Sequence, residues 1–387
     1  MRGSTRKRGA TWTAIWDAGT DPTTGKRKQG SKGGFRTKKL AEAFLDDTLP
    51  KVRAGVYVEP STEPLRAYLA RWLDAVDDEI KPGTLARYRQ LVAQYITPRE
   101  IGSVPLAGLT PAHFTRLYSD LEQCSDASCK LESHDGCRGL APGTRRLLHA
   151  CVRRALNDAV RHEDGLTRNP AARVKAPRID STRVMAWSPE ELSRFLDHVE
   201  HDRLYPLWRL AATTGMRRGE LLGLQWQTVD LDAATLRVER QLHPAGVGPR
   251  FGTPKSKRGL RQIALDAGTV EALRKHRERQ MVEQALAGDL YEHEQDLVFC
   301  NEIGQPIRPE WLTREFPKLR KAAGIPVGSL HVLRHTAVTI ALTRGVPVHI
   351  VAARAGDHPA TILATYAHLL PHSDVTAADA IAAAIGS

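Results

Sequence analysis

Two proline-containing breaks, Val58–Pro64 and Pro170–Arg183, divide this chain into three segments with different hydrophobic periods. Before the first break, Trp12, Ala14 and Trp16 alternate at the period of a half-buried strand. After it, apolar residues recur mainly at helical spacing. The sequence therefore predicts a multidomain, mainly α-helical protein with small β-sheets, and we place its domains at residues 1–58, 59–182 and 183–387.

The charge of the chain predicts a polyanionic partner. The net charge is +12 over 387 residues, and residues 1–40 carry 11 Lys and Arg against two Asp, a net charge of +9. Such clustering is typical of a segment that contacts nucleic-acid phosphates. The residues expected to make these contacts are Arg6, Lys7, Arg8, Lys26, Arg27 and Lys28. The alternative is a basic protein that does not bind nucleic acid.

The chain shows no pattern of export. The charged start is not followed by the apolar run of a signal peptide, and no stretch reaches the ~18 apolar residues of a membrane span. We expect a cytoplasmic, nucleoid-associated protein without a membrane partner.

The first segment is predicted to be a basic sheet supported by one helix. A strand over residues 11–17, a turn at Asp21–Gly25 and a second strand over residues 26–34 precede a helix at Lys38–Leu49 that Thr37 can cap. A sheet of this kind can read a DNA groove.

The middle segment is predicted to be helical. Thr84 is expected to open one helix, and Thr110 is expected to cap another. A later apolar stripe at residues 147–159 leaves an outer face that carries Arg145, Arg146 and Arg153. We expect this face to contact DNA; the alternative is a solvated basic face.

Four separated boxes in the last segment carry the chemistry. They are Thr213–Trp226 with Arg217 and Glu220, Thr253–Arg261 with Lys255 and Lys257, His331–Thr336 with His331 and Arg334, and Ala355–Leu369 with Tyr366. Each box alone also has a purely structural explanation, which is in turn a surface ion pair, an exposed turn, a polar helix face and a core tyrosine. A capping box at Ser188–Glu191 opens the segment, and strands are expected near residues 235–241 and 261–265.

Together, the order Arg, Lys, His-x-x-Arg, Tyr in a basic protein resembles the tyrosine recombinase (lambda-type phage and mobile-element integrase) family. The resemblance implies an arm-type DNA-binding module at 1–58, a helical (SAM-like) core-binding domain at 59–182 and a mixed α/β catalytic domain with a C-terminal tail at 183–387. It implies a site-specific integrase that cleaves and rejoins DNA through a 3′-phosphotyrosyl intermediate.

The resemblance also implies roles for the residues of the boxes. Tyr366 is the nucleophile, and Arg217 and Arg334 stabilise the phosphate. His331 adds a third donor to the phosphate or helps to deprotonate the tyrosine. Glu220 orients Arg217. Lys255 is the general acid, with Lys257 as a rival. Lys257 is also expected to contact DNA. The chemistry uses neither metal nor ATP, because the phosphotyrosine conserves the bond energy.

The chain departs from the family at one position. Where family members have His or Trp after a glycine, Gly356 is followed by Asp357, and His358 comes one residue later. Either His358 takes the assisting role, which we favour, or Asp357 is mainly a helix N-cap ahead of Pro359.

Three of the five cysteines cluster with a histidine in one loop. Cys124, Cys129, His134 and Cys137 could complete a tetrahedral zinc site. Their spacing is not a standard one, and free thiols in a polar insertion are the alternative.

The partners implied are double-stranded attachment sites and three further copies of the chain in a tetrameric synapse. A directionality factor and a DNA-bending protein are further partners that the arm module implies. A catalytically inactive DNA-binding regulator and a general type IB topoisomerase are the alternative functions.

Overall fold

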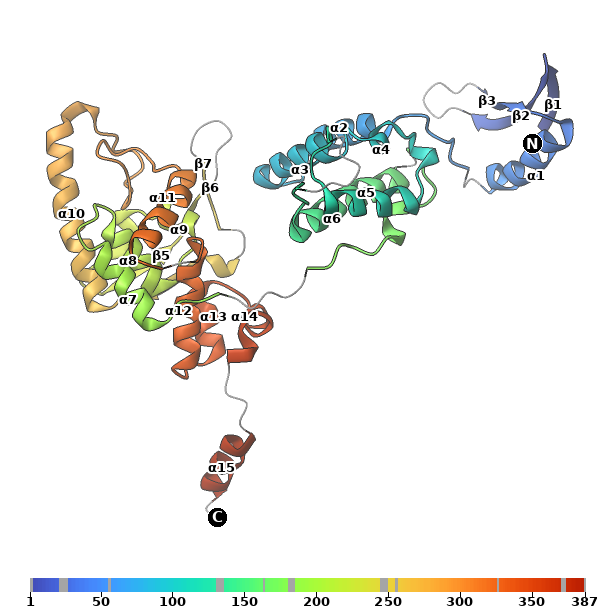
Figure 1. Ribbon diagram of the computed structural model, residues 1–387. Coiled ribbons are helices and arrows are strands. Elements are labelled where there is room, and N and C mark those ends of the chain that lie inside the picture. Colours follow the sequence, from blue (N-terminus) through green and yellow to red (C-terminus); the bar gives the residue numbers. More distant parts are fainter. Residues whose placement is uncertain are drawn as a thin grey trace. The chain divides into compact units, whose positions relative to one another are not determined.

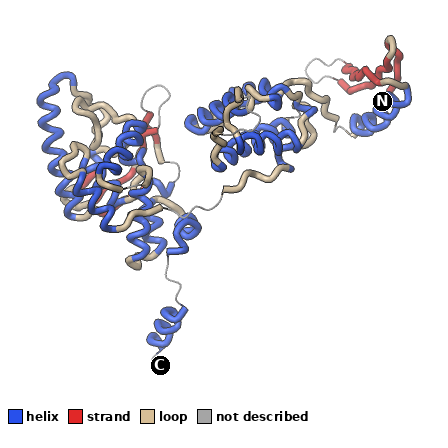
Figure 2. Tube along the Cα trace, in the orientation of Figure 1, coloured by secondary structure: helices blue, strands red, loops and turns tan. Residues whose placement is uncertain are grey.

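The computed structural model describes residues 3–20, 27–54, 57–129, 136–162, 164–179, 185–243, 250–254, 257–325, 327–369 and 374–385 (Figure 1). Its contacts divide the chain into two compact units, Met1–Asp180 and Ser181–Ser387. Helices dominate both units, and the strands form small sheets (Figure 2). This confirms the predicted fold class. The finer division into three domains stays a prediction.

The first unit begins with a three-stranded antiparallel sheet in the order β1-β2-β3, followed by one helix. The elements are β1 (Gly3–Arg8), β2 (Thr11–Thr20), β3 (Arg27–Phe35) and α1 (Lys38–Arg53). The backbone N–H of Leu40 bonds the Thr37 side chain at 3.3 Å, as the predicted cap requires. Gly30 is needed opposite Trp16, because a Cβ there would lie 2.3 Å from the indole. Strand β1 was not predicted, since its exposed polar residues carry no apolar alternation.

The rest of the first unit is helical, with its own apolar core. Its elements are α2 (Leu65–Ala75), α3 (Pro82–Tyr95), α4 (Glu100–Ser103), η1 (Leu106–Gly108), α5 (Pro111–Gln123), α6 (Pro142–Arg161) and η2 (Pro170–Arg173). The buried hydroxyl of Tyr68 donates to the Ala155 carbonyl at 2.7 Å and ties α2 to α6. The expectation that Thr84 opens α3 was wrong: Pro82 is the first helical residue, because its fixed φ suits that position.

The second unit contains a three-stranded sheet in the order β4-β5-β8, a β6-β7 ribbon and surrounding helices. Its elements are α7 (Pro189–His198), α8 (Tyr205–Thr214), α9 (Arg218–Leu222), η3 (Trp226–Thr228), β4 (Val229–Asp230), β5 (Thr235–Val238), β6 (Gln241–His243), β7 (Arg250–Gly252), η4 (Lys257–Gly259), β8 (Arg261–Ala264), α10 (Ala267–Ala287), η5 (Gly288–Leu290), α11 (Pro309–Ala322), α12 (His331–Thr343), α13 (Val348–Ala355), α14 (Pro359–Tyr366), η6 (Ala367–Leu369) and α15 (Asp374–Ile385). The Ser188 capping box is present as predicted.

Two apolar clusters hold the second unit together. The larger one is built around stacked and tilted rings of Trp187, Phe195, Trp208 and Phe316. The smaller one joins α12, α13 and α14 and includes Tyr366. It therefore fixes the helix that carries the predicted nucleophile. Within the described residues, no helix has the length and apolarity needed to cross a bilayer.

The buried imidazole of His276 predicts an acid-sensitive fold. Its Nε2 donates to the Val298 carbonyl at 2.7 Å, and burial lowers its pKa to about 4. Below its ordinary pKa of about 6.5, the unfolded chain binds a proton that the folded chain excludes, so the free energy of unfolding falls by up to about 3 kcal/mol as the pH drops to about 4. We expect His276→Gln to lose less stability over this range in urea unfolding. Equal losses in both proteins would contradict the assignment.

Candidate active site

A left-handed glycine places Arg217 at the start of α9. Gly215 ends α8 with φ +65, and Arg217 is the N-cap of the next helix. The backbone N–H and the guanidinium of Arg217 both donate to the Glu220 carboxylate, each at 2.9 Å. The two residues thus form one rigid turn, with Glu220 only 1% exposed.

Glu220 also accepts a hydrogen bond from a second arginine. Arg261, at the start of β8, donates to Glu220 at 2.8 Å and to the Arg354 carbonyl at 2.7 Å. Burial alone raises the pKa of Glu220, but the bonds and charges of Arg261 and Arg217 outweigh burial and hold this pKa below its ordinary value. The carboxylate therefore stays ionised and fixes Arg217 in place.

Arg217 and Arg334 meet at one carboxylate. Arg334 lies on α12, is 4% exposed, and donates to the Gly215 carbonyl at 2.7 Å. Its other terminal nitrogen donates to one oxygen of Asp357 at 2.5 Å, while Arg217 donates to the other oxygen. Two guanidiniums thus face one small anion, an arrangement suited to a phosphate group.

Tyr366 lies at the end of α14, beside this pair. Burial raises the pKa of its phenol to about 12, and nearby Arg334 partly opposes this effect. The hydroxyl lies 2.5 Å from Nδ1 of His335. Burial, followed by the charges of His331 and Arg334, lowers the pKa of His335 to about 4. His335 is therefore neutral near pH 7, and its Nδ1 can accept a hydrogen bond from the phenol.

His331 lies one helical turn before His335. The two imidazole rings meet edge-on with centroids 4.5 Å apart. Burial, together with Arg334 and Arg217, lowers the pKa of His331. A neutral ring can donate only one hydrogen bond from its protonated nitrogen. The structure thus brings Arg217, Glu220, His331, Arg334 and Tyr366 into one site, as the sequence boxes predicted.

The departure after Gly356 has a definite geometry. His358, not Asp357, is the N-cap of α14, and its Nδ1 accepts the Ala360 N–H at 3.1 Å. The alternative that Asp357 caps this helix was therefore wrong. Asp357 instead accepts hydrogen bonds from Arg217 and Arg334. The His358 ring is exposed, and it accepts the hydrogen bond that caps α14.

The two lysines proposed as general acid cannot be placed in the site. Lys255 lies outside the described residues. Lys257 begins η4, but its side chain is outside the described part of the structure.

Three members of the site were not predicted as such. His335 and Arg261 lie inside the boxes but were given no role, and Asp357 was considered only as a helix N-cap. A weak signal existed for His335, because it stands four residues after His331 on one helix and therefore shares its face.

The basic residues of the first 40 positions that were predicted to contact DNA are exposed where the structure describes their side chains. Arg6, Lys7 and Arg8 are exposed on β1. Lys26 lies outside the described residues, and Arg27 and Lys28 lie in β3 with side chains that are not described.

Two of the three arginines predicted on the outer face of α6 are there. Arg146 and Arg153 are exposed. The placement of Arg145 was wrong: it is 7% exposed and donates to Glu122 on α5 at 2.8 Å. Its position in the helix turns it toward α5, where its charge is paired. Arg145 thus ties two helices together.

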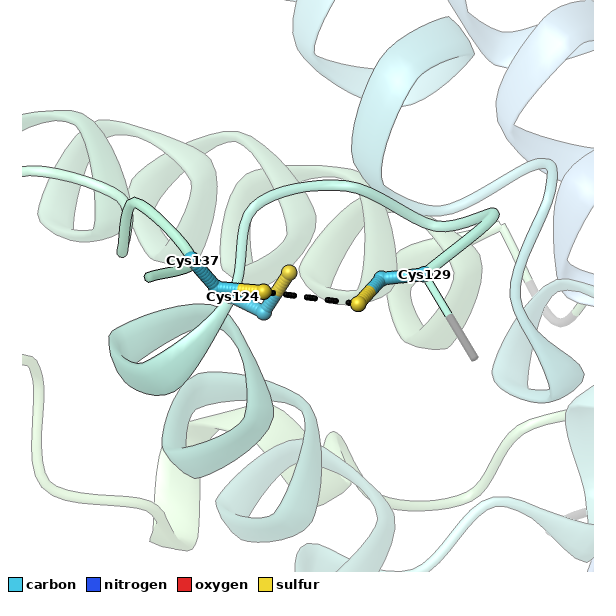
Figure 3. A group of neighbouring side chains, drawn as sticks. All are labelled: Cys124, Cys129 and Cys137. Carbon is cyan, nitrogen blue, oxygen red and sulfur yellow. Dashed lines mark hydrogen bonds between the residues drawn. The ribbon is translucent and has the colours of Figure 1, made fainter. Parts of the chain in front are cut away.

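Three cysteine side chains converge in the loop after α5. The sulfur atoms of Cys124, Cys129 and Cys137 all lie within 4.8 Å of one another, and those of Cys129 and Cys137 are 3.4 Å apart (Figure 3). Tetrahedral zinc with bonds of ~2.3 Å places its sulfur ligands about 3.8 Å apart. The three thiols therefore fit a zinc ion. His134, the predicted fourth ligand, lies outside the described residues.

Comparison with known sequence families gives two matches in the same order as the predicted modules. Residues 4–52 match the arm DNA-binding domain. Residues 187–372 match the phage integrase family, a range that contains all the residues of the candidate site.

Whole proteins and solved structures agree with this result. The chain is 28% identical over 366 residues to a tyrosine recombinase XerC-like protein of Caldanaerobacter subterraneus subsp. tengcongensis, covering 89% of this chain and 90% of the relative. The Tn1549 transposon integrase, solved with transposon right end DNA, has a TM-score of 0.63 at 17% identity and covers 84% of this chain and 100% of its own. A lambda integrase tetramer bound to a Holliday junction has a TM-score of 0.55 at 17% identity, with 92% and 94% covered. Residues 187–372 therefore form a domain of the phage integrase family of tyrosine recombinases, enzymes that cleave and rejoin DNA strands.

Proposed function

We propose that this chain integrates a phage or mobile element by cutting and rejoining DNA at attachment sites through a covalent bond to Tyr366. One observation supports the assignment of this activity to particular residues: Arg217 and Arg334 converge on a single anion, the Asp357 carboxylate, beside Tyr366. Attack on a phosphodiester builds negative charge on its non-bridging oxygens, and two fixed guanidiniums are suited to stabilise that charge. Glu220 positions Arg217 and takes no proton.

The phenol of Tyr366 must lose its proton as it attacks phosphorus. Because its pKa is raised to about 12, an acceptor is needed near neutral pH. We assign this acceptor to His335, whose Nδ1 faces the hydroxyl at 2.5 Å. His331, beside it, is then left to donate to the phosphate.

The step balances as one substitution at phosphorus. The bond from the tyrosyl oxygen to phosphorus forms, the bond to the 5′ oxygen breaks, and Lys255 or Lys257 gives that oxygen a proton. The 3′-phosphotyrosyl bond keeps the energy of the diester. A 5′ hydroxyl of a partner duplex can therefore reverse the step without ATP.

The rest of the chain holds the DNA. The first unit contacts phosphates through two sets of exposed side chains, which are Arg6, Lys7 and Arg8 on β1 and Arg146 and Arg153 on α6. Strand exchange between two duplexes requires two pairs of active sites, so we propose a tetramer on DNA. A directionality factor and a DNA-bending protein would assist at arm sites, and the complex would act at the nucleoid.

We further propose that Cys124, Cys129 and Cys137 hold a structural zinc ion, with His134 as the fourth ligand. The support is the convergence of three thiols near the spacing that zinc requires, in a loop that joins α5 to α6. A bound ion would fix this loop and leave the chemistry at Tyr366 unchanged.

Tyr366→Phe should abolish covalent adduct formation and leave DNA binding intact. A duplex core site is first selected by the variant from a random-sequence library. A nicked form of that duplex is then incubated with each protein in chelator and without ATP. We expect an SDS-resistant adduct with wild type alone. An adduct with the variant would reassign the nucleophile; binding by both without any adduct would favour a DNA-binding regulator.

His335→Gln should slow adduct formation by about 10²–10⁴-fold in single-turnover assays, because a positioned base is lost. The wild-type rate should be nearly constant near neutral pH, since the pKa of His335 is about 4. The variant rate should rise with pH toward the pKa of Tyr366, about 12. His349→Gln, an exposed change on α13, is the control. Parallel pH profiles for wild type and His335→Gln would exclude this role.

The zinc proposal predicts about one equivalent of metal in protein purified without chelator. Cys129→Ser should lose most of that zinc and lower the melting temperature, whereas Cys151→Ala, in the buried core of the same unit, should retain it. Elemental analysis measures the metal directly. Less than about a tenth of an equivalent in the wild type, or a disulfide among the three cysteines, would contradict the site.

A further inference from the structure

Asp357 occupies the centre of the arginine pair. It follows Gly356, which ends α13 with φ +70, and its own backbone N–H donates to the Ala352 carbonyl at 3.0 Å. Its carboxylate bridges Arg217 and Arg334, and its side chain is 23% exposed. The backbone is thus fixed in a tight turn, while the side chain borders solvent.

Asp357 engages the terminal nitrogen of each arginine that Glu220 and the Gly215 carbonyl leave available. Nη1 of Arg217 is held by Glu220 at 2.9 Å, and Nη1 of Arg334 is held by the Gly215 carbonyl at 2.7 Å. Asp357 accepts from Nη2 of both residues, and Nη2 of Arg217 also donates to the Gly356 carbonyl at 3.2 Å. A carboxylate presents two oxygens and one negative charge, as do the non-bridging oxygens of a phosphodiester. Asp357 therefore uses the donors that a scissile phosphate needs.

Both anions cannot hold these donors together. A phosphodiester entering beside the carboxylate would meet a like charge at short range, and the transition state adds further negative charge. The carboxylate must therefore leave the pair before the chemistry. Rotation about its Cα–Cβ bond toward solvent is sufficient, because the backbone of the turn need not move.

We propose that Asp357 is an internal counter-ion that fills the scissile-phosphate site of the free enzyme and is displaced when that phosphate enters. This inference rests on the proposed function. In the free enzyme, the carboxylate keeps two like-charged guanidiniums together in their working positions. It also makes phosphate binding competitive, so weakly held DNA backbone does not occupy the site. Asp357 is thus a positioning residue.

The test needs no DNA, because sulfate can stand in for the phosphate. Asp357→Asn keeps the shape of the side chain and removes its charge. Asp232→Asn removes the same charge from an exposed surface pair with Arg274, 2.9 Å apart, and is the matched control. Melting of the full chain is followed while sodium sulfate replaces sodium chloride at constant ionic strength.

We expect Asp357→Asn to melt lower than wild type without sulfate and to bind sulfate about tenfold more tightly than either other protein, judged from the concentration dependence of the melting temperature. A merely structural carboxylate would give the lower melting temperature without the gain in sulfate affinity. Equal sulfate affinity in all three proteins would overturn the inference.

A second measurement uses the selected duplex, with the scissile position mapped by the wild-type adduct. In a Tyr366→Phe background, Asp357→Asn should tighten binding of the natural duplex and leave binding of a duplex with an uncharged methylphosphonate at that position unchanged, relative to Asp232→Asn. Tightening of both duplexes alike would count against displacement by the phosphate. Failure of the proposed function shows separately, as absence of the Tyr366 adduct.

Discussion

The buried carboxylate of Glu220 is the interaction on which the active site depends. An ion that is 1% exposed is tolerated only when it is paired, and Glu220 is paired on both sides, by Arg217 and Arg261. Arg261 in turn bonds the carbonyl of Arg354 on α13. One carboxylate thus ties α9 and β8 together and, through Arg261, reaches α13, so the guanidinium of Arg217 is set before any substrate arrives.

Much of this site could be predicted from the sequence because its members come in short boxes with fixed local geometry. Arg217 and Glu220 stand three apart, and His331 and Arg334 do too, so each pair lies on one side of one turn. The order of the boxes then indicated the family, and the family implied the fold. The capping residues Thr37 and Ser188 were likewise readable, since the cap depends on neighbours in sequence alone.

What could not be predicted depends on contacts between distant elements. Helical periodicity gave Arg145 a polar position, but only the packing of α5 against α6 brings Glu122 beside it. The contact of His335 with Tyr366 joins residues 31 apart in the chain. The bridge formed by Asp357 requires the start of α9, α12 and the turn after α13 to meet. The spacing of residues in the sequence does not reveal contacts between distant elements. An aspartate in a turn ahead of a helix is also typical of an ordinary helix cap.

The shortness of α14 has a mechanical consequence. Asp357 precedes this helix by two residues and Tyr366 ends it, and the helix has eight residues, about 12 Å at ~1.5 Å per residue. Because a helix of this length is rigid and packs against α12 and α13, it fixes the backbone of the tyrosine relative to the turn that holds the aspartate. The aspartate side chain is then the part of this unit that can rotate when an anion enters, while the nucleophile keeps its place.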